Sequence, residues 1–186
     1  MLRSLVAILL FPMVLFCSVV LANEPTRAER LDQLFVTLKQ APDEGSARLI
    51  EHQIWKLWMT TGNPEVDGLM QQVMEARRWR DFDKALALLD RVVEIDPAYA
   101  EAWNQRATIA FQRGDYEKAL EYVARTLELE PRHFGALAGR GIIRLHQGKS
   151  ALAIQNIKAA MVFHPYLRER NLVPPQFRDI PADPDR

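Results

Sequence analysis

The sequence predicts an all-α protein built from three consecutive helix hairpins. Two observations lead to this prediction: side chains of matching size and polarity recur at one constant step along the chain, and the apolar residues inside each unit follow helical spacing. Six columns of residues share the step, which argues against a chance pattern. The columns are Pro97, Pro131 and Pro165; Ala85, Ala119 and Ala153; Leu86, Leu120 and Ile154; Leu69, Trp103 and Leu137; Val73, Ala107 and Gly141; and Ile95, Leu129 and Phe163.

The chain begins with a segment typical of a signal peptide. Arg3 precedes a nearly continuous apolar run over residues 4–21, and small residues favour cleavage after Ala22. Residues 1–22 are therefore expected to direct export to the bacterial periplasm. The alternative is an uncleaved inner-membrane anchor, because about 18 apolar residues is the lower limit for a spanning helix. Pro12 and the short basic flank favour cleavage.

Residues 23–65 are predicted to form a divergent helix pair. The first helix, Arg27 to Lys39, carries an apolar stripe of Leu31, Leu34, Phe35 and Leu38, and a turn follows at residues 42–45. The second helix, Ser46 to Met59, carries Ile50, Ile54, Leu57 and Trp58. We expect this pair to cap the first repeat, whose apolar face would otherwise be open.

Three repeat units follow, at residues 66–99, 100–133 and 134–167. In the central unit a first helix is expected over residues 100–113 and a second over residues 116–128. Gly114 breaks the two apart, because glycine accepts left-handed backbone angles. Pro131 ends the second helix, since proline disfavours helix in the residue before it. The small residues Ala107 and Ala119 let the two helices approach closely.

The central unit resembles a tetratricopeptide repeat (TPR). The family signature is a Trp, a Leu-Gly pair, a Tyr, an Ala, a Phe and a closing Pro within one repeat. The resemblance implies a right-handed helical solenoid of three hairpins that serves as a protein-binding scaffold, typical here of an exported bacterial protein. Trp103, Ala107, Ala119, Val123 and Pro131 fill the matching places, whereas Arg106 and Ala110 depart from the usual Leu and Tyr.

The resemblance also implies where a partner would bind. In this family the first helices of successive hairpins line a concave groove, and moving along the chain by one period gives rows of facing residues. Their mixture of apolar and polar groups suits an extended peptide or a partner helix. The rows are Met70, Asn104 and Ala138; Met74, Thr108 and Ile142; Arg77, Phe111 and Leu145; and Arg78, Gln112 and His146. From them we predict partner contacts at Met70, Met74, Arg77, Asn104, Thr108, Gln112, Ile142 and His146.

Two alternatives concern this groove. Met70, Met74 and Phe111 would instead pack against the N-terminal helices if those helices filled part of the groove. A clamp for the carboxylate of a chaperone tail, which some family members contain, is rejected. The matching places hold Met70, Met74, Gly135 and Gly139, whose side chains cannot donate a hydrogen bond.

The C-terminal segment, residues 168–186, is predicted to be a tail. A short closing helix is expected over residues 166–172, followed by a loose stretch with Pro174, Pro175, Pro181 and Pro184.

Composition and motifs give no support for catalysis. The formal net charge of +0 argues against a nucleic-acid binder, which needs a basic field. Cys17, the single cysteine, lies in the signal segment, so the mature chain would have no disulfide. The four histidines lack ligand spacing, and His133 and His164 are expected to bond backbone groups or face solvent. We therefore expect a non-enzymatic protein without metal or cofactor.

Overall fold

The computed structural model describes residues 24–178. The predicted signal peptide, its cleavage site and Cys17 lie outside the described residues, as do residues 179–186 of the predicted tail. No helix within residues 24–178 is both long enough and apolar enough to cross a bilayer.

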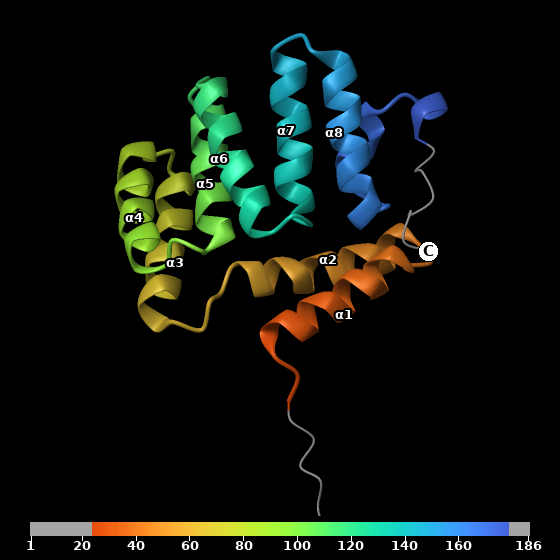
Figure 1. Ribbon diagram of the computed structural model, residues 1–186. Helices are drawn as coiled ribbons and strands as arrows, with labels where there is room; N and C mark the ends of the chain where they lie inside the picture. Colours follow the sequence, from red (N-terminus) through yellow and green to blue (C-terminus); the bar gives the residue numbers. More distant parts are fainter. Residues whose placement is uncertain (1–23, 179–186) are drawn as a thin grey trace, which may run out of the picture.

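Every regular element of the described chain is helical, which confirms the predicted all-α solenoid (Figure 1). The three hairpins are α3–α4, α5–α6 and α7–α8, and they stack side by side in chain order. Their second helices begin at Phe82, Tyr116 and Ser150, each one repeat period after the last. The elements are α1 (Arg27–Lys39), α2 (Glu44–Trp58), α3 (Pro64–Arg78), α4 (Phe82–Ile95), α5 (Ala100–Gln112), α6 (Tyr116–Leu129), α7 (Phe134–His146), α8 (Ser150–Phe163) and the 3₁₀ turns η1 (Arg168–Leu172) and η2 (Pro175–Phe177).

The turn inside each hairpin has the same backbone conformation in all three repeats. Gly114 and Gly148 have φ of +78° and +72°, and Arg80, one period before Gly114, has φ of +58°. Glycine adopts this left-handed region readily, whereas an L side chain does so at a cost. The first repeat therefore contains a strained arginine at the position where the other two have glycine.

Small residues set the distance between the two helices of a hairpin. Ala85, Ala119 and Ala153 are all completely buried, as expected for one column of small residues. In the third hairpin a Cβ added to Gly141 would lie 2.6 Å from Ile157 Cγ1. The helices α7 and α8 therefore approach each other closely at this glycine.

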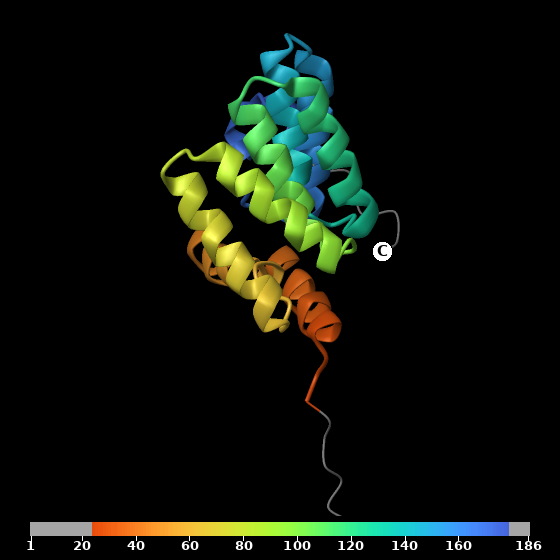
Figure 2. The ribbon, with the colours of Figure 1, turned by 90° about the vertical axis from the view of Figure 1, so that its left-hand side faces the viewer.

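The prediction that the N-terminal pair caps the first repeat is wrong. Helices α1 and α2 lie across the base of the solenoid, and their apolar stripe packs against the third repeat (Figures 1 and 2). Phe35 meets Phe134 and Phe163 edge-on, with ring centroids 6.3 Å and 6.1 Å apart. Arg132 also donates to Asp32 at 2.6 Å.

The outward face of α3 explains why the first repeat needs no cover. In α5 the residues that pack toward the preceding hairpin include Tyr99 before the helix, Ala102 and Ile109, all buried. The matching positions one period earlier are Glu65, Gly68 and Glu75, which a polar outer surface can leave in water. The apolar stripe of α1–α2 therefore finds its partner at the apolar base of the third repeat.

The segment after α8 is packed more firmly than a loose tail. Val173 is completely buried and contacts Ile157 and Met161 of α8. Arg178 Nε donates to the Val173 carbonyl at 2.7 Å, which holds the second 3₁₀ turn in place. The expectation of a loose stretch is therefore wrong at Val173, because this valine finds a hydrophobic site on the last helix.

Candidate functional site

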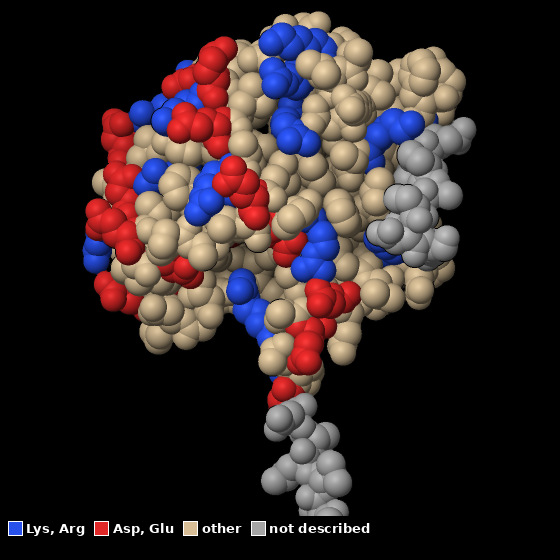
Figure 3. Space-filling view, viewed as in Figure 1, with Lys and Arg blue, Asp and Glu red and all other residues tan. Residues whose placement is uncertain are grey.

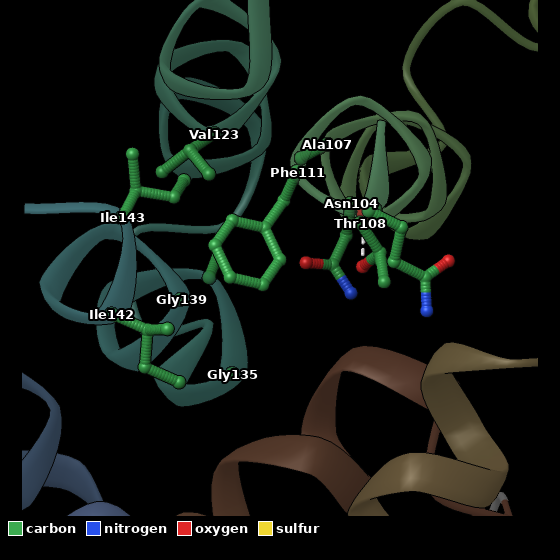
Figure 4. A pocket seen from close by; sticks show the side chains of 11 residues that line it. Asn104, Ala107, Thr108, Phe111, Val123, Gly135, Gly139, Ile142 and Ile143 are labelled. Carbon is green, nitrogen blue, oxygen red and sulfur yellow. Dashed lines mark hydrogen bonds between the residues drawn. The ribbon is translucent and has the colours of Figure 1, made fainter. Parts of the chain in front are cut away.

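A hollow lies between the first helices of the second and third repeats. Its volume is about 270 Å³, and side chains of α5 and α7 form most of its wall (Figure 4). No Lys, Arg, Asp or Glu is among the lining residues, so the hollow offers apolar surface with a few neutral polar groups. They are Asn104, Ala107, Thr108, Phe111, Gln112, Val123, Gly135, Ala136, Gly139, Ile142 and Ile143.

One polar row of α5 faces the hollow as predicted. Asn104, Thr108 and Gln112 stand at successive helical turns, which places them on one side of the helix. Thr108 donates its hydroxyl hydrogen to the Asn104 carbonyl at 3.0 Å, and Asn104 donates its amide hydrogens to Glu101 at 3.1 and 3.2 Å. The Asn104 Oδ1 and the Thr108 lone pairs therefore remain as acceptors. Exposed Gln112 adds both a donor and an acceptor.

Phe111 and two glycines shape the apolar part. The Phe111 ring reaches from α5 toward α7, where Gly139 presents no side chain (Figure 4). A Cβ on Gly139 would meet nothing within 4 Å, so this helical position opens directly into free space. At the base of the hollow, a Cβ on Gly135 would lie 2.8 Å from Trp55, which shows how tightly α2 closes that end.

The remaining predicted contacts fall into different surroundings. His146 stands at the rim, its ring 5.0 Å from Phe111, and Ile142 lines the hollow. Met74 is 38% exposed on α3 and lies away from this hollow. Arg77 donates to Gln105, and burial lowers the pKa of its guanidinium.

Met70 is placed wrongly by the sequence-based prediction. It is 1% exposed and belongs to the hydrophobic core of the first repeat, so it does not reach the groove. Ala138, in the same predicted row, is buried against the N-terminal pair. The alternative that α1–α2 fill the groove thus holds only at the base beneath the third repeat, because Phe111 packs into the cluster formed by α5, α6 and α7 instead.

A buried polar network supports the base of the hollow. Glu101 is 1% exposed and accepts hydrogen bonds from Asn104 and Gln105. His133 Nε2 lies 2.9 Å from the same carboxylate, while its Nδ1 accepts from the Ala136 backbone N–H at 3.1 Å. The tautomer with hydrogen on Nε2 satisfies both bonds. Three donors therefore hold the Glu101 carboxylate rigidly beneath Asn104.

Trp58 at the end of α2 joins this network to the N-terminal pair. Its ring stacks on His133 at 4.0 Å, and its carbonyl accepts from the Tyr99 hydroxyl at 2.8 Å. Burial raises the pKa of that hydroxyl, and the nearby Glu101 carboxylate adds to the effect. Tyr99 and His133 are one period apart, so equivalent positions of two repeats hold the same tryptophan.

Sequence reasoning missed Glu101, His133 and Trp58 as a unit. Solvent or backbone contact was expected for His133 and His164, yet both are buried. His133 does cap α7 through its ring, while His164 lies 3.3 Å from Glu51 of α2. A signal existed in the period itself, because His133 aligns with an aromatic residue at the same helix start. No cluster of three potential metal-ligating side chains occurs among residues 24–178.

Comparisons with known proteins agree with this geometry. A model of the tetratricopeptide repeat family matches residues 80–140. A TPR repeat-containing protein of Rhizobium etli is 38% identical over 86 residues, which are 46% of this chain and 42% of that protein. This chain therefore matches less than half the length of that relative.

Solved structures with the same fold are also found. The second TPR domain of Spaghetti (RPAP3), solved with the HSP90 peptide SRMEEVD, aligns with a TM-score of 0.51 and 20% identity, covering 54% of this chain and 94% of that one. MamA aligns with a TM-score of 0.49 and 17% identity over 74% of this chain and 77% of its own. The structure is a helical-repeat solenoid, and residues 80–140 match the tetratricopeptide repeat family.

Proposed function

We propose that this protein is an adaptor of the bacterial cell envelope, which holds a peptide or helix of a partner protein in the hollow between α5 and α7. The proposal rests on one observation: the hollow combines uncharged apolar surface with a row of neutral hydrogen-bonding groups on α5. Apolar pockets with a few placed polar groups are typical of ligand sites. No catalytic step is needed for this role.

The lining groups favour a particular kind of segment. Phe111, Gly139 and Ile142 would surround an apolar side chain of the partner, while the acceptors on Asn104 and Thr108 would bind its backbone N–H groups. RPAP3, whose fold this chain shares, was solved with a bound peptide, which supports a peptide as the ligand class. That peptide ends in Glu-Glu-Val-Asp. With no Lys or Arg in the lining, we expect this protein to prefer a neutral, apolar segment.

Cross-linking in cells tests the groove directly. A photo-reactive amino acid at Gln112, exposed at the hollow, is compared with one at Glu121, exposed on α6 away from it. Capture of one partner from Gln112 but not from Glu121 is the expected result. Equal capture from both positions would show that the binding face has been misassigned.

Export is a separate part of the proposal. The predicted signal segment, residues 1–22, would direct the mature protein to the periplasm, and the same segment uncleaved would give an inner-membrane-anchored assembly factor. The intact mass of the protein isolated from cells distinguishes the two. We expect the mass of a chain that begins after Ala22. The mass of a chain that begins at Met1 would favour the anchored form.

A further inference from the structure

Charge is strongly segregated along the solenoid. Residues 24–130 contain fourteen Lys and Arg against twenty Asp and Glu, a formal charge of −6, whereas residues 131–178 contain eight Lys and Arg against Glu169 alone, a charge of +7. The whole-chain balance conceals this separation. Figure 3 shows Lys and Arg gathered over α7 with no acidic atoms beside them. A field of one sign attracts partners of the opposite sign.

The cations of the third repeat lack carboxylate partners. Arg140 donates to the amide of Asn156, whereas Arg106, one period earlier, donates to Asp90. Arg144 donates to the amide of Gln147 at 2.9 Å. Lys158 on α8 makes no ion pair with any residue in the range 24–178. The positive charge of this repeat is therefore uncompensated within the described chain.

The open side of α8 shows where a partner would lie. Between the first two repeats, Arg106 and Arg113 of the α5 hairpin bond Asp90 and Asp83 of α4. The equivalent positions on α8, two periods later, are Lys158 and Ala151. Where α4 presents two aspartates that pair with the next hairpin, α8 therefore presents a lysine and an alanine.

This stripe forms a hollow that the rest of the described chain leaves open. It has a volume of about 420 Å³ and is lined by Ala151, Ile154, Gln155, Lys158, Ala159 and Val162. The C-terminal segment covers only the adjoining face, through Val173 against Ile157 and Met161. From residue 151 to residue 162 the stripe runs for about three helical turns, roughly 17 Å.

We propose that this α8 stripe docks an acidic amphipathic helix of a partner protein. The contact between the first two repeats provides the precedent, since two exposed aspartates along α4 pair with arginines of the next hairpin. The sign is reversed at α8, so an acidic side chain opposite Lys158 and apolar ones opposite Ile154 and Val162 would complement it. A helix has a convex surface and can enter this hollow along α8. A bilayer surface is flat and does not reach the floor of the hollow.

Two synthetic peptides of about sixteen residues test the proposal. Both carry the same leucine stripe at helical spacing, with glutamate on the flanks of one and lysine on the flanks of the other. Fluorescence anisotropy with the full mature chain should show binding of the glutamate peptide at least about tenfold tighter than that of the lysine peptide, weakening as salt rises. Lys158→Glu should remove this preference, while Lys84→Glu, a matched change on α4, should leave it intact.

The outcomes separate this site from the groove. Gly139→Leu, which fills the hollow between α5 and α7, should not change glutamate-peptide binding, and circular dichroism confirms that each variant is folded. Equal affinity for the two peptides, or an unaltered preference in Lys158→Glu, would overturn the proposal. Binding to phosphatidylglycerol vesicles without binding to the glutamate peptide would also overturn it, in favour of a lipid surface.

Discussion

Two glycines of α7 provide a matched test of how closely the third hairpin is packed. Gly139 and Gly141 both lie inside the helix, where replacement by alanine gains about 1 kcal/mol of intrinsic helix stability. At Gly139 nothing lies within 4 Å of the added Cβ, so the full gain is expected. At Gly141 the Cβ would lie 2.6 Å from Ile157 Cγ1 and 3.1 Å from the Ala153 carbonyl oxygen.

Overpacking of that kind costs about 1–3 kcal/mol. We therefore expect Gly139→Ala to raise the free energy of unfolding by about 1 kcal/mol and Gly141→Ala to lower it by up to about 2 kcal/mol, after its own helix gain is subtracted. Urea unfolding followed by circular dichroism measures both, provided the slope against denaturant is unchanged.

A third variant shows whether Ile157 is the cause. Ile157→Ala removes Cγ1 and Cδ1, which lie 2.6 Å and 3.3 Å from the added Cβ, and should cost less in the Gly141→Ala background than in the wild type. If Gly141→Ala stabilised the protein as much as Gly139→Ala, α7 and α8 would be farther apart than described. Close approach of the two helices would then not explain why small residues recur in these columns.

Three further predictions concern turns, caps and pH. Arg80→Gly should stabilise the protein by up to about 1 kcal/mol, because it removes a left-handed arginine, and Gly114→Arg should destabilise it; thermal unfolding of the two variants measures both signs. Lys149→Asp should raise the unfolding free energy by about 1 kcal/mol in urea, because the N-cap of α8 has no side-chain hydrogen bond at present. The hydrogen bond from His164 lowers the pKa of Glu51 below its ordinary 4.5. The ionised Glu51 carboxylate therefore contributes fully to folding stability above pH 4.5, and this contribution is lost as the pH falls through the lowered pKa. Glu51→Gln should therefore reduce stability at pH 7 more than in acid, and a similar reduction at both would refute this reading.

The sequence was sufficient for the repeats because their information is local. Helical spacing and a closing proline recur in all three repeats, a glycine turn recurs in two of them, and the second helices begin one period apart as predicted. Aspartates at positions 81 and 115 cap two of these helices through their side chains. Each signal acts within a few residues of its effect, so no tertiary contact was needed to interpret it.

The docking of the N-terminal pair could not be predicted in the same way. An apolar stripe shows which side of a helix is buried but does not name its partner, and Asp32 meets Arg132 from a distant part of the chain. The polar outward face of α3 was a usable sign that the first repeat needs no cap. The groove prediction is correct in part for the same reason. The lining of the hollow includes Asn104, Thr108, Gln112 and Ile142, whereas Met70 is buried in the core of the first repeat.

The central claim is that a partner segment binds in the hollow between α5 and α7. The most direct test measures how tightly the captured segment binds a variant in which this hollow is filled. Gly139→Leu would place its side chain in the hollow beside Phe111 while keeping a good helix former in α7. We expect the segment to bind the folded variant at least about tenfold more weakly than the wild type, a loss of about 1.4 kcal/mol. Binding of the segment to Gly139→Leu with wild-type affinity would contradict the assignment of the hollow between α5 and α7 as the binding site.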